Sequence, residues 1–318
     1  MSALILISGA GQLGSRYLQG LAKCSNTLKI LVHDSKNLSL QNAKKRWDEV
    51  SNPNNHEVLF INSLKILPKK IDVAIVSTTA NSRLQATKNI CKSTTVDYWI
   101  LEKVLAQSEI DIDKLTSIIN PSKAWVNKPR RLMPWHQKIK KKLDWSKPVI
   151  FYVKGGSWGL ACNAIHFLDL FAWWTGESLE AINTKDLDKN WFESKRQDFW
   201  EVSGELNAKF SRGTVAYISA DNSSDPVLIQ VESNSGNYSW LINEAEGLAI
   251  SSDGAEISGN LNFQSEITAD LIDSILDTGN CSLSTLKESA ELHKIFINEL
   301  YKHWNNFNNS SSAYIPIT

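Results

Sequence analysis

Three glycines near the amino terminus, Gly9, Gly11 and Gly14, have the spacing of a turn that holds a diphosphate. They follow an apolar run at residues 4–7 and precede residues with helical spacing, which predicts a strand, a turn and a helix. The N–H groups that open a helix bind negative charge, because they lack partners within the helix and the helix dipole adds to their field. Phosphate contacts are therefore expected at Gly9, Gly11, Gln12, Leu13 and Gly14.

A carboxylate, Asp34, follows the second apolar run at residues 28–33. A carboxylate at that place accepts hydrogen bonds from both ribose hydroxyls of NAD and repels a 2′-phosphate, so Asp34 favours NAD. The polar residues after Asp34 offer a 2′-phosphate other partners, which leaves NADP as the alternative cofactor. Ser77 and Thr78, at the end of an apolar run at 71–78, are expected to complete the cofactor site.

Lys103 and His166 are the residues that we expect to act on a substrate hydroxyl. Oxidation of a secondary alcohol needs a base for the hydroxyl proton and a cation for the developing alkoxide, and a nicotinamide supplies neither. Histidine titrates near neutrality and suits the base, and lysine suits the cation. Each residue also has a purely structural interpretation. Lys103 could be a surface lysine that forms an ion pair with Glu102, and His166 could be a core residue whose hydrogen bonds are satisfied within the protein.

The elements that must position these residues are short apolar strands alternating with helices. Strands are expected at 58–61, 71–78 and 97–103, and helices at 40–47 and 81–92. This alternation is typical of a parallel sheet, whose strands end at one edge. Asp34, Thr78, Glu102 and Lys103 are therefore expected to face one crevice, with Glu102 and Lys103 touching the cofactor.

The second part of the chain has a different pattern. A loop-like segment at 127–134, a basic helix at 135–143 and a strand at 149–155 precede an apolar helix within 158–174 that Gly176 ends. Short turns at 211–213 and 234–237 punctuate strand-like runs at 202–210, 214–220, 227–232, 238–243 and 248–251. Helices at 266–277 and 284–305 close the chain. The sequence thus predicts an α/β fold, with a Rossmann parallel sheet at 1–122 and an α+β domain with a largely antiparallel open sheet at 123–318.

This organisation, with Glu102-Lys103 after the fifth strand and His166 at a helix start, resembles the Gfo/Idh/MocA oxidoreductases over nearly the whole chain. The resemblance implies hydride transfer between NAD or NADP and a hydroxyl or ketone of a sugar, cyclitol or nucleotide-sugar, with biosynthesis of a surface polysaccharide sugar as one setting. The family motifs Glu-Lys-Pro and Asp-x-x-x-His place its lysine at Lys103 and its histidine at His166. Val104 replaces the proline and Cys162 the aspartate.

The same resemblance extends to substrate contacts. Asn127 and Arg131 match a family-like Asn-x-x-x-Arg loop, and an arginine fork there suits a carboxylate or a diphosphate. Trp158 and Asn163 offer a flat aromatic face and an amide for a sugar, although core packing explains Trp158 almost equally well. Asp169 shares a helical face with His166 and either orients the imidazole, binds a substrate hydroxyl or plays a structural part.

Bulk composition excludes some function classes. Lys+Arg 34 and Asp+Glu 34 balance, which gives no electrostatic case for nucleic acid or an anionic membrane. The 4 cysteines are scattered and predict neither a zinc site nor a disulfide framework, which fits a reducing cytoplasm.

The resemblance implies a homodimer or homotetramer formed through the open sheet face. Two alternatives stay open: a reductase of an imine or other non-sugar carbonyl, and a non-catalytic dinucleotide-binding sensor.

Overall fold

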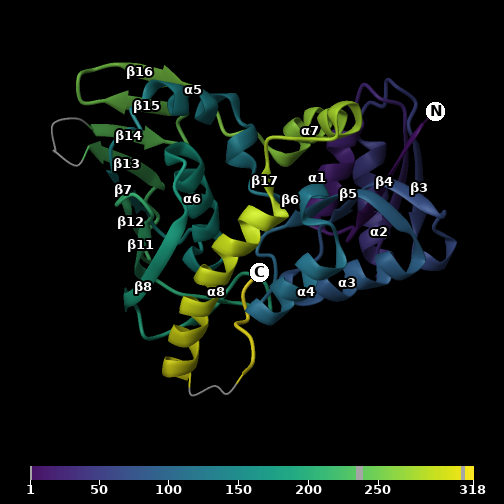
Figure 1. Ribbon diagram of the computed structural model, residues 1–318. Helices are drawn as coiled ribbons and strands as arrows, with labels where there is room; N and C mark the ends of the chain where they lie inside the picture. Colours follow the sequence, from purple (N-terminus) through teal and green to yellow (C-terminus); the bar gives the residue numbers. More distant parts are fainter. Residues whose placement is uncertain (1, 234–238, 309–311) are drawn as a thin grey trace. The chain divides into compact units, whose positions relative to one another are not determined.

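The computed structural model describes residues 2–233, 239–308 and 312–318, which form two compact units (Figure 1). Unit 1 comprises the chain up to Ala106 together with Ile110–Leu132 and Asn262–Ala290. Unit 2 comprises Gln107–Glu109, Met133–Leu261 and Glu291–Thr318. The division expected from the sequence cuts the chain once, between residues 122 and 123, whereas each compact unit is assembled from separated segments.

Unit 1 contains a sheet with the strand order β17-β6-β5-β4-β1-β2-β3, parallel except at the β17–β6 pair. The order reverses between β1 and β4, and ligands of such sheets bind outside the carboxyl ends of the strands at this switch point. The strands are β1 (Ala3–Ser8), β2 (Leu28–His33), β3 (Glu57–Ile61), β4 (Lys70–Val76), β5 (Thr95–Glu102), β6 (Ala124–Asn127) and β17 (Ser284–Thr285).

Helices α1, α2 and α7 share one hydrophobic core with this sheet. Gly20 allows α1 and α7 to approach closely, because a Cβ atom at Gly20 would lie 2.6 Å from the Cβ atom of Thr268. The helices are α1 (Gln12–Leu21), α2 (Asn37–Asp48), α3 (Ala80–Ser93), α4 (Glu109–Ile118) and α7 (Gln264–Thr278), with 3-10 turns η1 (Leu64–Ile66), η2 (Pro121–Lys123) and η3 (Pro129–Leu132).

Unit 2 contains a sheet with the order β16-β15-β14-β13-β7-β12-β11-β8, antiparallel except for the parallel pair β7–β12. Burial alternates along β12, as expected for a sheet covered on one face. Its strands are β7 (Val149–Lys154), β8 (Leu179–Leu187), β11 (Gly204–Phe210), β12 (Val215–Ala220), β13 (Leu228–Ser233), β14 (Ser239–Asn243), β15 (Leu248–Ser251) and β16 (Glu256–Ser258). A separate hairpin pairs β9 (Phe192–Glu193) with β10 (Trp200–Glu201).

Helix α6 covers the buried face of that sheet. The ring of Phe151 in β7 stacks on Phe171 in α6 with 3.9 Å between centroids. Trp174 and Trp145 stack beside them, which accounts for part of the high tryptophan content. The helices are α5 (Pro134–Lys142), α6 (Leu160–Thr175) and α8 (Leu286–Asn308), of which α8 begins in unit 1 and continues in unit 2.

The predicted fold class is confirmed: a parallel sheet occupies unit 1 and a mostly antiparallel sheet occupies unit 2. The sequence patterns missed α4, β6 and β8, and 127–134 is a strand end and a 3-10 turn rather than a plain loop. Burial does not alternate strictly along β8, because the pairing of β8 with β11 shifts register twice.

The turn expected at 234–237 and the start of the strand expected at 238 lie outside the described residues. None of the helices in the described ranges is long and apolar enough to cross a membrane.

Candidate functional site

The glycine turn between β1 and α1 packs against the end of β4. Gly9 has φ +102°, and a Cβ atom there would lie 3.0 Å from backbone atoms of Ser77 and Thr78. A Cβ atom at Gly14 would lie 1.9 Å from the backbone oxygen of Gly9, so only glycine lets the helix lie this close to the turn. The Ser77 hydroxyl donates to the Gly9 oxygen at 2.7 Å and fixes the turn to β4.

Gly11 differs from its two neighbours in the motif. A Cβ atom at Gly11 would meet nothing within 4 Å, and its φ of −68° is open to any residue. Gly11 is the N-cap of α1, and no side chain caps this helix end. The backbone of Gln12 and Leu13 therefore presents first-turn N–H groups to the open space beside Gly11, as a phosphate cradle requires.

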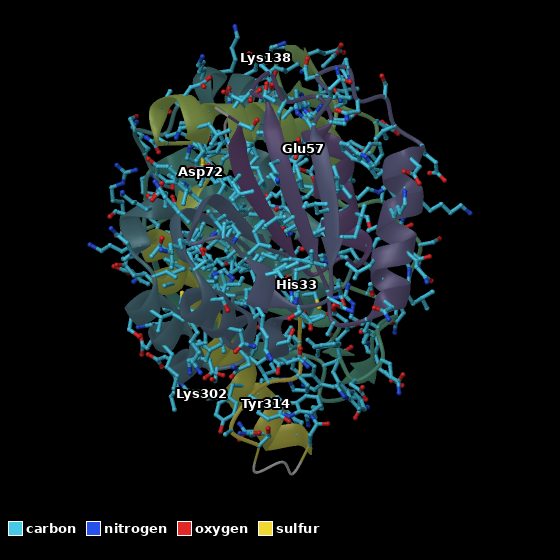
Figure 2. All side chains as sticks on the ribbon, turned by 90° about the vertical axis from the view of Figure 1, so that its right-hand side faces the viewer. His33, Glu57, Asp72, Lys138, Lys302 and Tyr314 are labelled. Carbon is cyan, nitrogen blue, oxygen red and sulfur yellow. The ribbon has the colours of Figure 1, made fainter. Side chains whose placement is uncertain are left out.

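Asp34 lies directly beside the same turn. Its Oδ2 atom accepts from the backbone N–H of Ala10 at 2.8 Å, and its Oδ1 atom accepts from that of Lys36 at 2.8 Å. The preceding residue, His33, ends β2 and accepts through its backbone oxygen from Gly9 N–H. In Figure 2, His33 lies at one end of the strands and Glu57 at the other, so the turn and Asp34 occupy the carboxyl edge of the sheet.

Arg83 is a residue of this edge that sequence reasoning missed. It projects from α3, is 1% exposed, and donates to the backbone oxygens of Thr78 and Val104. A further hydrogen bond reaches the Leu105 oxygen at 3.1 Å. The buried guanidinium thus ties the segment after β4 to the segment after β5. No local pattern marks it, because an arginine in a helix is usually solvated.

Glu102 and Asn127, expected to contact cofactor and substrate, belong to a buried hydrogen-bond network. Glu102 Oε1 accepts from the Tyr17 hydroxyl at 2.5 Å and from Asn127 Nδ2 at 2.7 Å. Asn127 Nδ2 also donates to Gln264 at 2.8 Å. Burial raises the pKa of Glu102, opposed by these two hydrogen bonds, and burial together with the adjacent Glu102 raises the pKa of Tyr17. The network anchors the residue before Lys103, which is itself half-buried.

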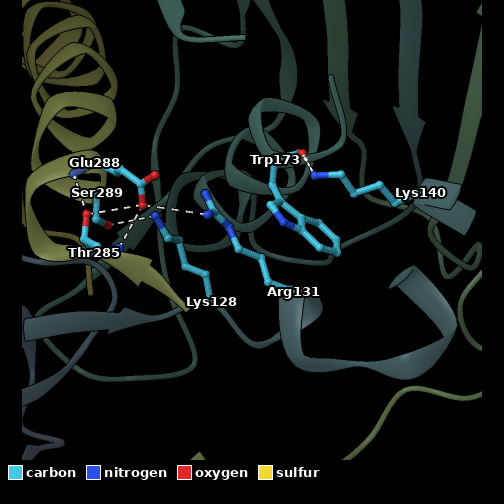
Figure 3. Close-up of polar contacts among 7 residues, drawn as sticks. All are labelled: Lys128, Arg131, Lys140, Trp173, Thr285, Glu288 and Ser289. Carbon is cyan, nitrogen blue, oxygen red and sulfur yellow. Dashed lines mark hydrogen bonds and ion pairs between the residues drawn. The ribbon is translucent and has the colours of Figure 1, made fainter. Parts of the chain in front are cut away.

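Two cations lie near the start of α8 (Figure 3). Lys128 is 1% exposed and donates from Nζ to the Ser289 hydroxyl at 2.7 Å. Arg131 is largely buried, and its Nη1 atom lies 3.8 Å from Oε2 of Glu288. That oxygen also accepts from the Thr285 backbone N–H at 2.9 Å. The family resemblance places Arg131 among the substrate contacts, whereas no sequence pattern predicts the burial of Lys128.

In unit 2, the predicted substrate residues gather on α6 and the turn before it. Asn163 Nδ2 donates to the Trp158 backbone oxygen at 2.8 Å, and Trp158 Nε1 donates to the Ser219 oxygen at 3.0 Å. His166 is half-buried one turn further along, and Asp169 is buried. Cys162 shares this helical stripe, because residues three and four apart lie on one face. The predicted residues thus form two sets, one in each unit.

No protein-family model and no curated protein matches the sequence. Solved structures nevertheless share the fold over nearly the full length of both chains. UDP-N-acetylglucosamine 3-dehydrogenase from Acidithiobacillus ferrooxidans superposes with a TM-score of 0.70 at 12% identity, covering 94% of this chain and 97% of that one. Scyllo-inositol dehydrogenase from Lactobacillus casei, solved with NAD(H) and scyllo-inositol, gives 0.67 at 15% identity, covering 96% and 98%.

A third neighbour has different chemistry. Biliverdin reductase from Synechocystis, in complex with biliverdin and NADP+, superposes with a TM-score of 0.71 at 12% identity, covering 94% of this chain and 98% of that one. The predicted resemblance to two-domain oxidoreductases is therefore confirmed for the fold. Identity this low leaves the reaction to be argued from the site.

Proposed function

We propose that this protein is a nicotinamide-dependent oxidoreductase that interconverts a hydroxyl and a ketone on a sugar, cyclitol or nucleotide-sugar. The observation that carries the proposal is the uncapped start of α1, with open space at Gly11 and the Asp34 carboxylate held beside it. The fold shared with the UDP-N-acetylglucosamine and scyllo-inositol dehydrogenases supports this substrate class.

The cofactor residues fit a dinucleotide. The turn at Gly11 holds the diphosphate on backbone N–H groups, and Asp34 accepts from the ribose hydroxyls, which favours NAD over NADP. Ser77 and Thr78 line the same strand edge. The bound nicotinamide supplies the hydride exchange, and the protein must supply the charge and proton chemistry.

Lys103 and His166 have the chemistry for that task. The Lys103 ammonium stabilises negative charge on the substrate oxygen, and the His166 imidazole takes or returns the hydroxyl proton. The Glu102 network fixes the strand end that carries Lys103. Asn127, Arg131, Trp158, Asn163 and Asp169 are the proposed substrate contacts, with Arg131 suited to an anionic substituent.

Replacing each member of this pair tests the proposal. With UDP-N-acetylglucosamine and scyllo-inositol as substrates and NAD as acceptor, His166→Ala and Lys103→Met are each expected to lower kcat by about 100-fold or more. The NAD dissociation constant of His166→Ala should stay unchanged, and the exposed control Lys123→Met should keep native turnover. Native turnover in both variants would contradict the assigned roles.

A second candidate function, reduction of a non-sugar carbonyl or imine, is supported by the fold shared with biliverdin reductase. In the imine reaction His166 is dispensable, because no substrate hydroxyl is deprotonated and the reduced nitrogen can take its proton from solvent. Turnover of a conjugated imine by the native protein and by His166→Ala alike would favour this candidate over the dehydrogenase.

The proposed enzyme is an assembly of identical chains in the cytoplasm. The open face of the unit 2 sheet carries the stacked rings of Tyr152 and Tyr217, and exposed Leu241 and Ile250 extend its apolar surface. Such a surface supports a homodimer or a homotetramer. The 4 cysteines are joined by no disulfide, in line with a reducing compartment.

A further inference from the structure

Helix α6, which carries Asn163 and His166, begins without a capping side chain of its own. Its N-cap residue is Gly159, in the left-handed region at φ +77°. The acceptor for a first-turn N–H comes from elsewhere in unit 2. Glu201 Oε2, on β10, accepts from the backbone N–H of Ala161 at 2.8 Å. A carboxylate at this helix end is stabilised by the unpaired N–H groups and by the helix dipole.

The Glu201 carboxylate occupies the space that a side chain at residue 159 would need. A Cβ atom at Gly159 would lie 2.9 Å from Glu201 Oε1 and 3.3 Å from Asn163 Nδ2. The glycine therefore does two things, since it supplies the positive φ and leaves room for Glu201 next to the Asn163 amide. The acid, the glycine and the amide of a proposed substrate contact meet at the start of α6, and Asn163 lies about one turn before His166.

Separate segments of unit 2 hold Glu201 in place. Glu201 is 5% exposed and pairs with Phe192 across the β9–β10 hairpin. The backbone N–H of the adjacent Trp200 donates to the Pro316 oxygen at 2.8 Å, and the Trp200 ring lies 5.4 Å from that of Trp304. A charged side chain this buried is costly unless it is well bonded, so the hairpin and the carboxyl-terminal residues serve to deliver it to α6.

We propose that Glu201 is a positioning residue, which rests on the proposed function and adds a residue to its machinery. By fixing the first turn of α6, Glu201 sets the orientation of Asn163 and His166 toward the substrate. As a positioning residue, Glu201 acts through the helix by its hydrogen bond to the Ala161 N–H. No local sequence pattern marks Glu201, because it is distant in the chain from Ala161 and lies in no motif.

The test compares Glu201→Gln, Glu201→Ala and the control Glu193→Ala, which removes an exposed acid from the same hairpin. Glutamine keeps an oxygen that accepts from Ala161 N–H, whereas alanine does not. Hydrogen exchange over residues 159–167 is expected to be about tenfold faster in Glu201→Ala and near native in Glu201→Gln. With UDP-N-acetylglucosamine or scyllo-inositol, kcat/KM should fall about 100-fold in Glu201→Ala while NAD affinity stays native, because small misplacements of reacting groups cost this much.

The outcomes separate the two proposals. Native exchange in Glu201→Ala, or native kcat/KM in that variant of an active enzyme, overturns the role of Glu201. If the native protein turns over no sugar or cyclitol, the proposed function fails, and the exchange measurement alone decides whether Glu201 holds α6. Equal losses in Glu193→Ala would assign the effect to the hairpin rather than to Glu201 and would also overturn the proposal.

Discussion

At the scale of single residues, the glycines of the phosphate turn are not equivalent. Gly9 and Gly14 are required by the fold, since a Cβ atom at either would crowd the backbone. Gly11 is unconstrained within the chain, because its φ is ordinary and its Cβ position is open. The space beside Gly11 is what a diphosphate needs, so we propose that this glycine serves the ligand rather than the fold.

Substitution separates these two uses of glycine. Gly11→Ala is expected to keep the native Tm and to weaken NAD binding by about tenfold or more, because the methyl group occupies the phosphate space. Gly14→Ala is expected to lower the Tm, because its Cβ would lie 1.9 Å from the Gly9 oxygen. Thermal unfolding and calorimetric titration with NAD check both. Unchanged NAD affinity in a folded Gly11→Ala variant would contradict the assignment of the cradle.

At the scale of elements, the ends of neighbouring strands are joined by buried polar groups. The Tyr17–Glu102–Asn127 network joins α1 to the ends of β5 and β6. Burial raises the pKa of Glu102, so the folded state holds the proton more tightly than the unfolded state does. The stability contributed by this group is fully present below the unfolded pKa and is lost as pH rises through the folded pKa.

Glu102→Gln removes this titration and keeps an oxygen acceptor for Tyr17 and Asn127. The variant is therefore expected to gain stability relative to the native protein as pH rises from the ordinary glutamate range to neutrality. Urea unfolding at several pH values measures the difference in unfolding free energy. Parallel curves for the two proteins over that range would show that Glu102 does not titrate as inferred.

Arg83, on α3, is the second buried polar group that joins the ends of neighbouring strands. Arg83→Met removes the donors to the segments after β4 and β5 and leaves buried carbonyl groups unsatisfied. The free energy of unfolding should fall by roughly 3 kcal/mol, as is common for loss of a buried charged hydrogen-bond donor. Chemical denaturation measures this, with exposed Lys92→Met on the same helix as the control. A loss as small as that of the control would refute the structural role of Arg83.

At the scale of the whole molecule, the open face of the unit 2 sheet bears on assembly. Light scattering is expected to give a mass of two or four chains for the native protein. Tyr217→Arg places a charge among the apolar groups of that face and should lower the mass while leaving the Tm nearly native, since Tyr217 is only half-buried. A native protein that stays monomeric would remove the assembly proposal.

Some features of this molecule follow from local sequence patterns, and others depend on contacts between distant parts of the chain. The sequence by itself determined the glycine turn, Asp34 and most strands and helices, because these depend on backbone preference and on the short-range period of apolar residues. It also placed Lys103 at a strand end and His166 on a helix. It missed β8, whose irregular register hides the alternation.

Only the tertiary structure decided which charged groups are buried and what they hold. Arg83, Lys128 and Glu201 are ordinary polar residues in the sequence, and each acquires its role from partners distant in the chain. Likewise α7 packs on α1 at Gly20, a contact that no local period encodes. The physical reason is common to all of them. Long-range contacts offset the cost of burying a charge and decide which elements pack together, and these contacts exist only after the chain has folded.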